Sequence, residues 1–226
     1  MPNITAVIPA GGSGTRLGSA TPKQFLKVGG VPILVATVRH FVSHPEIEAV
    51  VVAAPSKLVE RTERLLRPHA RRVRVRVVAG GAERQESVWR GVQAAAAETE
   101  IIVVHDAVRP FITRQLIDAV VQAARDVGAA ICALPIAETV KRVRDDLVET
   151  TVDRSALWAV QTPQAFRAAL LREAHEKAQR DGVLGTDDAM LVERLGHPVR
   201  VVRGSEANVK ITTPADLRRA RAMGRR

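Results

Sequence analysis

The chain has 226 residues, of which 46% are hydrophobic and 3% aromatic, and its formal net charge is +10. This length accommodates one α/β domain with a sizeable core, and we expect a single domain over residues 1–226. The charge suggests nucleic acid as a partner, but without any Tyr and with so few other aromatic side chains there is little with which to stack bases. We therefore expect no nucleic-acid partner.

Membrane insertion and secretion are not indicated either. No apolar run approaches the roughly 20 residues of a membrane span, and Met1–Asn3 lacks a basic region that precedes an apolar one. We expect a cytoplasmic location and no membrane association. The single cysteine, Cys132, excludes an internal disulfide, and its apolar neighbours predict a buried strand residue rather than a nucleophile.

Apolar runs of strand type alternate with helical patterns over the first 134 residues. Strands are predicted at Ile4–Ile8, Ile47–Ala54, Val73–Val78, Ile101–Val104 and Ala129–Leu134. Helices are predicted at Val31–Pro45, Leu58–Leu66, Glu83–Ala97 and Gln115–Val127. Continuous apolar strands that alternate with helices predict a Rossmann-like α/β fold, whose mostly parallel sheet is covered by helices on both faces. Ligands then bind at the carboxyl ends of the strands.

The strand at Val73–Val78 has a distinct pattern, because Arg72, Arg74 and Arg76 alternate with valines. Such alternation predicts one buried and one solvated face, and exposed charge on an edge strand discourages edge-to-edge aggregation. We therefore interpret these arginines as the exposed face of an edge strand.

The alternation of predicted strands and helices is interrupted after Pro135. Residues 138–143 and 147–152 alternate polar and apolar around Arg144-Asp145-Asp146, which predicts an inserted β-hairpin within about residues 136–156. The hairpin either folds on its own domain or forms an arm that reaches a second subunit. Beyond it we expect helices at Ala165–Ala178, Thr186–Leu195 and Pro214–Ala222, and short strands at Val199–Val202 and Val209–Ile211.

A glycine-rich turn follows the first strand. Glycines at 11, 12 and 14 let main-chain N–H groups approach an anion, and Arg16 and Lys23 follow within reach. The spacing matches neither standard nucleotide loop: no Lys directly follows the last glycine as in G-x-x-x-x-G-K-[ST], and Leu17 stands where G-x-G-x-x-G needs a glycine. An ordinary strand-to-helix turn would not need two cations, so the stretch predicts a nucleoside triphosphate site.

Further candidates follow other predicted strands. The loop Ala79–Ser87 could edge a flat base with its main chain, with Ser87 facing the same space. Asp106 follows a strand beside the phosphate loop, where a carboxylate typically holds Mg²⁺; the alternative is an ion pair with Arg109 that shapes a loop. Thr186 is either a helix N-cap or a phosphate contact. Lys210 is equally compatible with an inert exposed lysine and a functional one.

Several motifs together resemble the 2-C-methyl-D-erythritol 4-phosphate cytidylyltransferases of non-mevalonate isoprenoid synthesis, from about Ile4 to about Ala220. These motifs are PAGGSGTRLG, PKQ, GGAERQESV, VHDAVRPF, ETVKR, TVDRSALW, QTPQAF, GTDDAMLVE and NVKITTPADL. The resemblance implies transfer of the cytidylyl group of CTP to the polyol phosphate, with Mg²⁺ or another divalent cation as cofactor and a homodimer formed by arm exchange.

The resemblance also implies roles for individual residues. Catalysis falls to Arg16, Lys23, Asp106 and Lys210, and Asp106 is also the metal ligand. The nucleotide contacts are Pro9, Ala10, Gly11, Gly12, Gly14, Gly80, Gly81, Ala82 and Ser87. The acceptor contacts are Asp106, Arg109, Thr162, Thr186 and Lys210, together with Thr139 and Arg154 from the partner subunit.

Three positions depart from the family pattern. Gly11 stands where Ala is frequent and Val108 where another Ala is frequent, and both variants resemble the ribitol 5-phosphate cytidylyltransferases; Ala82 stands where an acidic residue is often found. The motifs TVDRSALW and GTDDAMLVE favour methylerythritol phosphate over this alternative. A sugar-1-phosphate nucleotidyltransferase or a non-catalytic nucleotide-binding module would share the glycine loop and are further alternatives.

Overall fold

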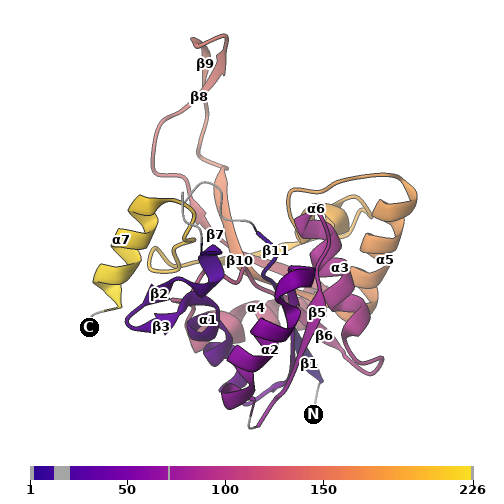
Figure 1. The fold of residues 1–226 in the computed structure, drawn as a ribbon. Helices are drawn as coiled ribbons and strands as arrows, with labels where there is room; N and C mark the ends of the chain where they lie inside the picture. The colour runs from indigo at the N-terminus through magenta and orange to yellow at the C-terminus, as the bar shows by residue number, and fades with distance from the viewer. Residues whose placement is uncertain (1–2, 13–20, 71, 225–226) are drawn as a thin grey trace.

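The computed structural model describes residues 3–12, 21–70 and 72–224. These residues form a seven-stranded sheet in the order β11-β7-β10-β6-β1-β4-β5 (Figure 1). The strands are β1 (Ile4–Pro9), β4 (Ile47–Ala54), β5 (Arg74–Ala79), β6 (Ile101–Val104), β7 (Ala129–Pro135), β10 (Trp158–Arg167) and β11 (Arg200–Arg203). Neighbouring strands are parallel except at β10, which pairs antiparallel with both β6 and β7. The predicted mostly parallel sheet is therefore confirmed.

Helices cover both faces of the sheet. Successive apolar side chains of β1 point to opposite faces and therefore belong to two different cores. Ile4, Ala6 and Ile8 belong to a core with α1 (Ile33–Val42), α2 (Val59–Leu66) and α4 (Arg114–Val127). Val7 belongs to a second core with α3 (Arg84–Ala94), α5 (Ala168–Arg180) and α6 (Asp188–Glu193). The remaining helix, α7 (Pro214–Met223), packs near the short hairpin of β2 (Lys27–Val28) and β3 (Val31–Pro32).

The predicted inserted hairpin is confirmed as β8 (Val140–Arg144) and β9 (Leu147–Val152). Asp145 and Asp146 form its turn with φ of 48° and 61°, both positive as in the tight turns that suit the twist of a hairpin. Figure 1 shows the hairpin projecting from the body of the molecule. Its apolar side chains are exposed, Leu147 by 73% and Val148 by 61%, so it does not fold back on its own sheet.

Besides the helix predicted at Thr186–Leu195, four element predictions are wrong at their edges or in kind. The helix predicted at Ala165–Ala178 begins at Ala168, because residues 165–167 complete β10. The helix predicted from Val31 begins at Ile33, since Val31 and Pro32 pair with β2 across a Gly29–Gly30 turn. The helix predicted at Glu83–Ala97 spans Arg84–Ala94. The strand predicted at Val209–Ile211 is a loop that a single main-chain bond from Ile211 joins to Val108.

Thr186 does not cap the helix that follows it. Asp187 is the N-cap of α6, and its side chain accepts from the Met190 amide at 3.0 Å, so the helix predicted at Thr186–Leu195 spans Asp188–Glu193. Aspartate competes well with threonine for this position because its carboxylate also complements the helix dipole.

Within the described part of the chain, no helix is both long and apolar enough to cross a membrane. The expectation of a single domain over residues 1–226 stays a prediction.

Candidate active site

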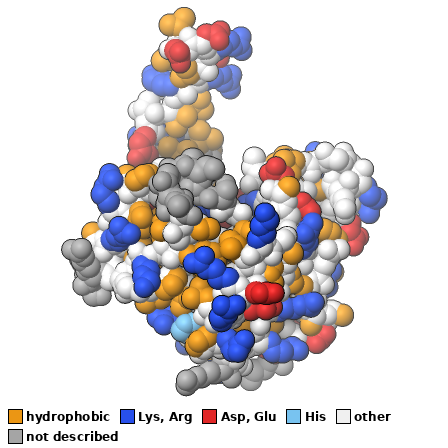
Figure 2. Space-filling model, in the orientation of Figure 1, with side chains coloured by type: hydrophobic (Ala, Val, Ile, Leu, Met, Phe, Trp, Pro, Cys, Tyr) orange, Lys and Arg blue, Asp and Glu red, His pale blue; other side chains and the backbone are white. Residues whose placement is uncertain are grey.

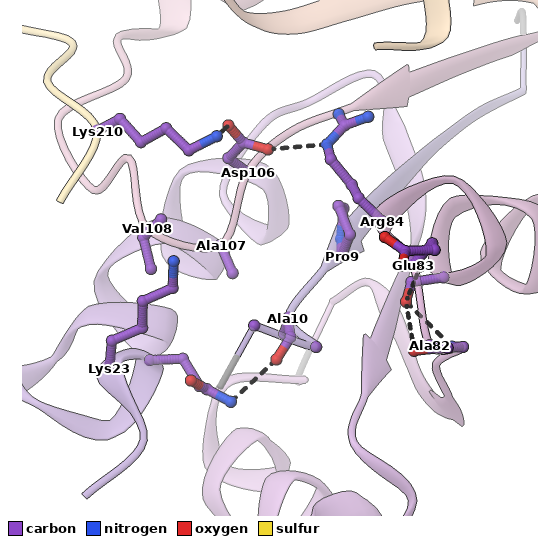
Figure 3. A pocket seen from close by; sticks show the side chains of 15 residues that line it. Pro9, Ala10, Lys23, Ala82, Glu83, Arg84, Asp106, Ala107, Val108 and Lys210 are labelled. Carbon is purple, nitrogen blue, oxygen red and sulfur yellow. Dashed lines mark hydrogen bonds and ion pairs between the residues drawn. The ribbon is translucent and has the colours of Figure 1, made fainter. Parts of the chain in front are cut away.

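A pocket of about 360 Å³ lies at the carboxyl ends of the central strands, where the fold prediction placed the ligand (Figure 3). It is formed by the end of β1, the loop after β5 and the loop after β6. The predicted site residues that line it are Pro9, Ala10, Gly11, Gly12, Lys23, Gly81, Ala82, Ser87, Asp106 and Lys210. Gly14 and Arg16 were predicted beside them but lie outside the described residues.

Lys23 begins a short 3₁₀ turn, Lys23–Phe25, that is tied to the end of β1. The buried side-chain amide of Gln24 donates to the Ala10 carbonyl at 2.9 Å. This bond places Lys23 against the glycine turn: a β-carbon added to Gly12 would lie 3.1 Å from Lys23 Cε. Figure 3 shows the Lys23 side chain pointing into the pocket. The structure therefore joins this cation to the glycines, as the spacing predicted.

The loop after β5 is closely packed around its glycines. A β-carbon on Gly81 would lie 2.2 Å from Glu86 Cδ, and one on Gly80 would lie 2.9 Å from Ser87 Oγ. The Gly81 amide donates to Ser87 Oγ at 3.0 Å, and the Ala82 amide donates to Glu86 Oε2 at 2.9 Å. Gly80 is itself buried and supports the loop from behind the pocket lining.

Asp106 is the electrostatic centre of the pocket. Its carboxylate lies 2.9 Å from Lys210 Nζ, 3.3 Å from Arg84 Nε and 3.5 Å from Arg109 Nε. Burial by itself would raise the pKa of Asp106, but Arg84, Lys210 and Arg109 together hold it well below its usual range. The carboxylate is therefore ionised. The ion pair between Asp106 and Arg109, which was the alternative to a ligand-binding role, is present. The Asp106 side chain nevertheless also lines the pocket.

Thr162 supports Asp106 from behind and does not line the pocket. Its hydroxyl oxygen accepts from the Asp106 amide at 3.0 Å and lies 3.2 Å from His105 Nδ1. His105 Nε2 lies 3.1 Å from the Arg109 carbonyl, which only accepts, so Nε2 carries the proton and Nδ1 accepts from Thr162. Burial lowers the pKa of His105 to about 4, which keeps the ring neutral. Asn208 completes the shell by accepting from Arg109 and donating to the Thr162 carbonyl, each at 2.8 Å.

Arg84 is a pocket residue to which the sequence assigned no role. It is the first residue of α3, and its guanidinium contacts both Asp106 and Asp188, the latter at 2.8 Å through Nη1 (Figure 3 shows the contact with Asp106). Burial would lower the pKa of Arg84, but the two carboxylates raise it further above its already high value. Its place directly after a glycine loop was a usable signal, whereas its partner Asp188 lies 104 residues along the chain.

Five predicted acceptor contacts, counting Thr162, lie outside the pocket lining. Thr186 is exposed, and its hydroxyl lies 3.8 Å from the Met190 sulfur. Thr139 and Arg154 are exposed at the base of the arm, where the Arg154 guanidinium donates to the Ala137 carbonyl of its own chain. Arg109 is buried beside Asp106.

A metal in this pocket would find few protein ligands. No group of three or more His, Cys, Asp or Glu side chains that could hold a metal occurs in the described residues. Mg²⁺ nevertheless commonly binds through one or two carboxylates, with water and substrate phosphates as its other ligands. The ionised oxygens of Asp106 fit that donor set, provided that one of the cations now beside them moves, and Lys210 is 40% exposed.

Comparison with known proteins gives a consistent result. The family model for 2-C-methyl-D-erythritol 4-phosphate cytidylyltransferase matches residues 4–226. A curated protein of that name from Symbiobacterium thermophilum is 50% identical over 218 residues, which are 96% of this chain and 91% of the relative. Another from Syntrophus aciditrophicus is 45% identical over 218 residues, with 96% and 93% covered.

Comparison with solved structures points to the same family as comparison with sequences. A crystal structure of 2-C-methyl-D-erythritol 4-phosphate cytidylyltransferase from Thermus thermophilus has a TM-score of 0.81 at 38% identity and covers 99% of this chain and 100% of that one. The 4-diphosphocytidyl-2C-methyl-D-erythritol synthase from Anaerococcus prevotii has a TM-score of 0.88 at 31% identity, with 100% and 97% covered. The chain thus belongs to the 2-C-methyl-D-erythritol 4-phosphate cytidylyltransferase family.

Proposed function

We propose that the protein transfers the cytidylyl group of CTP to 2-C-methyl-D-erythritol 4-phosphate, a step in the synthesis of isoprenoid precursors. The products are 4-diphosphocytidyl-2-C-methyl-D-erythritol and pyrophosphate. The observation that carries this proposal is a pocket, in a chain of this family, in which a glycine turn and Lys23 face Asp106 and Lys210. A non-catalytic nucleotide-binding module would have no use for the second pair.

The chemistry needs no catalytic base. A phosphate monoester has a second pKa of about 6, so the acceptor phosphate is mostly dianionic at neutral pH. One of its oxygens forms a bond to the α-phosphorus of CTP, while the bond from that phosphorus to the bridging oxygen breaks and pyrophosphate leaves with the electron pair. The obstacle is the repulsion between two anions, so catalysis consists of positioning and electrostatic stabilisation.

The side chains of the pocket suit this task. Lys23, with Arg16 earlier in the sequence, would neutralise the triphosphate that the glycine turn holds by its main chain. The loop of Gly81 and Ala82 would edge the cytosine with main-chain groups, which tolerates Ala82 in place of an acidic residue. The Lys210 side chain would break its ion pair with Asp106 and bind the acceptor phosphate instead. The partial exposure of Lys210 permits this movement.

The remaining acceptor contacts are proposed from the family resemblance and from their place in the fold. Arg109 and Thr162 hold the loop that carries Asp106. Thr186 presents an exposed hydroxyl ahead of α6. We propose that these side chains orient the acceptor phosphate.

A divalent cation, Mg²⁺ or another, is the proposed cofactor, with Asp106 as its protein ligand. When bound, such an ion neutralises charge on the triphosphate and on the departing pyrophosphate. The variant Asp106→Asn keeps the shape of the side chain but not the charge that holds the ion. We expect this variant to lose most metal-dependent turnover, measured by titration with magnesium. Unchanged activity and magnesium dependence in a folded variant would place the metal elsewhere.

We propose further that two copies exchange the β8–β9 arm in a homodimer. The exposed apolar side chains Val143, Leu147 and Val148 would be covered by the second subunit. Thr139 and Arg154 lie at the base of the arm and outside the pocket lining of their own chain, so they are available to a neighbouring site. Light scattering should give the mass of a dimer, whereas an active monomer would contradict the exchange.

The decisive assay for the function incubates the protein with CTP, Mg²⁺ and either methylerythritol phosphate or ribitol 5-phosphate, followed by mass spectrometry of the products. We expect the methylerythritol product. Preference for ribitol phosphate would instead indicate the paralogous activity, to which Gly11 and Val108 in the pocket lining would contribute. Turnover of UTP or dTTP with a sugar 1-phosphate would indicate the other nucleotidyltransferase class. The cytoplasmic location stays a prediction that cell fractionation would test.

A further inference from the structure

Arg84 occupies a bridging position between two carboxylates. Its Nε lies 3.3 Å from Asp106 Oδ1, while Nη1 of the same guanidinium lies 2.8 Å from Asp188 Oδ2. Lys210 contacts the other oxygen of Asp106, Oδ2, so the two oxygens of this carboxylate are held from different sides. The orientation of Asp106 therefore depends on where Arg84 stands.

The far side of this bridge is buried. Asp188 and His175 are each 1% exposed, and His175 Nε2 lies 3.1 Å from Asp188 Oδ1. The Trp89 ring stacks on the His175 ring with an interplanar angle of 11° and a centroid separation of 5.6 Å. A chain of contacts thus runs from Trp89 on α3 and His175 on α5, through Asp188 on α6, to Arg84 and the pocket.

The same region fixes the loop that precedes α6. The Gln85 side chain donates to the Val183 carbonyl at 3.0 Å and accepts from the Gly185 amide at 2.7 Å. The side-chain amide of Gln164 donates through Nε2 to Asp187 Oδ2 at 2.7 Å. Arg84 and Gln85, adjacent in sequence, therefore connect the start of α3 to both ends of the segment that carries Thr186.

We propose that Arg84 is a positioning residue, which Asp188 and His175 hold in place so that it fixes the carboxylate of Asp106 for its proposed contact with the acceptor. This inference rests on the proposed cytidylyl transfer. It concerns the acceptor more than CTP, because Asp106, the ion-pair partner of Arg84 that lines the pocket, is a proposed acceptor contact. The described contacts of the nucleotide loop, from Gly81 to Ser87 and from Ala82 to Glu86, do not involve Arg84.

The variants Arg84→Lys and Asp188→Asn separate charge from geometry. A lysine retains the positive charge, but a single ammonium on a flexible stem cannot bridge two fixed carboxylates as a guanidinium does. We expect each variant to lower kcat/KM for the acceptor about 10- to 100-fold, as is typical when a residue that orients a ligand-binding side chain is lost. The dissociation constant of CTP, measured by calorimetry without acceptor, should remain that of the wild type.

The double variant tests whether the two residues act as one unit. If Arg84 works through Asp188, the double variant should lose no more than the more damaging single variant, whereas independent effects would multiply. Lys177→Ala is the matched control, because it removes an exposed ion pair with Asp181 from the same helix as His175. It should have wild-type kinetics.

The outcomes distinguish this inference from the proposed function. Wild-type protein that fails to turn over CTP and methylerythritol phosphate would overturn both. An active wild type overturns the positioning role alone if folded Arg84→Lys keeps its kcat/KM for the acceptor, if CTP affinity falls as much as acceptor use, or if the losses multiply. Arg84 is 29% exposed, so Arg84→Lys decides the question even where Asp188→Asn fails to fold.

Discussion

The cationic side chains around Asp106 outnumber the carboxylates that they contact. Asp106 and Asp188 contribute two negative charges, and Arg84, Arg109 and Lys210 contribute three positive ones, which leaves an excess of one. Lys23 in the same pocket adds a further positive charge. Such an excess in a recessed site attracts phosphates and raises the rate at which they associate.

Lys23→Ala should lower kcat by about 100- to 1000-fold, the usual cost of losing one electrostatic donor to the transition state. Lys23 lies against the glycine turn, where its charge would meet the triphosphate. Steady-state kinetics beside a thermal melt measures the effect, with Lys27→Ala, an exposed lysine of β2, as the control. Wild-type turnover in Lys23→Ala, or loss of its folding, would defeat the assignment.

Cys132 should be inert in the folded protein. It is fully buried in β7, as its apolar neighbours predicted, and burial raises the pKa of its thiol to about 12. Because the thiolate is the reactive form, a thiol reagent at pH 8 should label the protein only after denaturation. A colorimetric assay with and without denaturant checks this. Rapid labelling of the native protein would show that β7 opens to solvent.

At the scale of the elements, α7 depends on a capping box. The Thr213 hydroxyl accepts from the Asp216 amide at 3.2 Å. The Asp216 carboxylate accepts from the Thr213 amide at 2.7 Å and from the Thr212 amide and hydroxyl at 2.9 and 2.7 Å. Burial alone would raise the pKa of Asp216, but these hydrogen bonds lower it to about 2 from 3.8. The ionised carboxylate therefore favours the folded state.

Asp216→Asn should lower the free energy of unfolding by about 1 kcal/mol at pH 7. The lowered pKa fixes the sign of the pH dependence: the contribution is complete above the unfolded value of 3.8 and is lost as pH falls through about 2. Urea titrations should therefore show a constant difference between the two proteins at pH 7 and pH 5 that shrinks below pH 4. Glu206→Gln, an exposed carboxylate beyond β11, is the control. A difference that grows on acidification would be inconsistent with this capping role.

The elements differ in how well the sequence predicts them. The apolar run Ile47–Ala54, interrupted only by Glu48, identifies β4 because a strand buried on both faces is nearly continuously apolar. β10 is not predicted: residues 158–164 belong to no predicted element, and residues 165–167 fall in the predicted helix that follows. Pro163 is tolerated where the pairing register with β7 shifts between Gln161 and Gln164, a place that does not need its missing N–H.

The residues of the site also differ in how well the local sequence predicts them. Asp106 and the glycine turn follow apolar strands, so their local sequence placed them correctly in one pocket. The contact of Arg84 with Asp188 joins α3 to α6, and local sequence carries no signal for such distant pairs. Lys210 could not be decided from its short strand-like run, because its role depends on a contact with Asp106 that only the fold creates.

At the scale of the whole molecule, the excess of positive charge is spread over the surface. Figure 2 shows blue side chains dispersed over the visible face among other types. Arg72 just before β5 and Arg74 and Arg76 within it are exposed, and β5 lies at the end of the sheet, so the predicted edge strand is confirmed. Charge on this edge opposes pairing with another strand and leaves the arm as the proposed route to association.

Exchange of the arm predicts that two inactive variants restore each other. In Arg154→Ala the pocket keeps Lys23, and in Lys23→Ala the arm keeps Arg154, whose guanidinium can grip a phosphate in a bidentate contact. A mixed dimer would then have one site with both residues and one with neither. Random subunit exchange should therefore recover about a quarter of wild-type activity, because half of the dimers are mixed and one of their two sites is complete. Native mass spectrometry verifies the exchange. A mixture no more active than its components, despite verified mixed dimers, would show that the arm serves only its own chain.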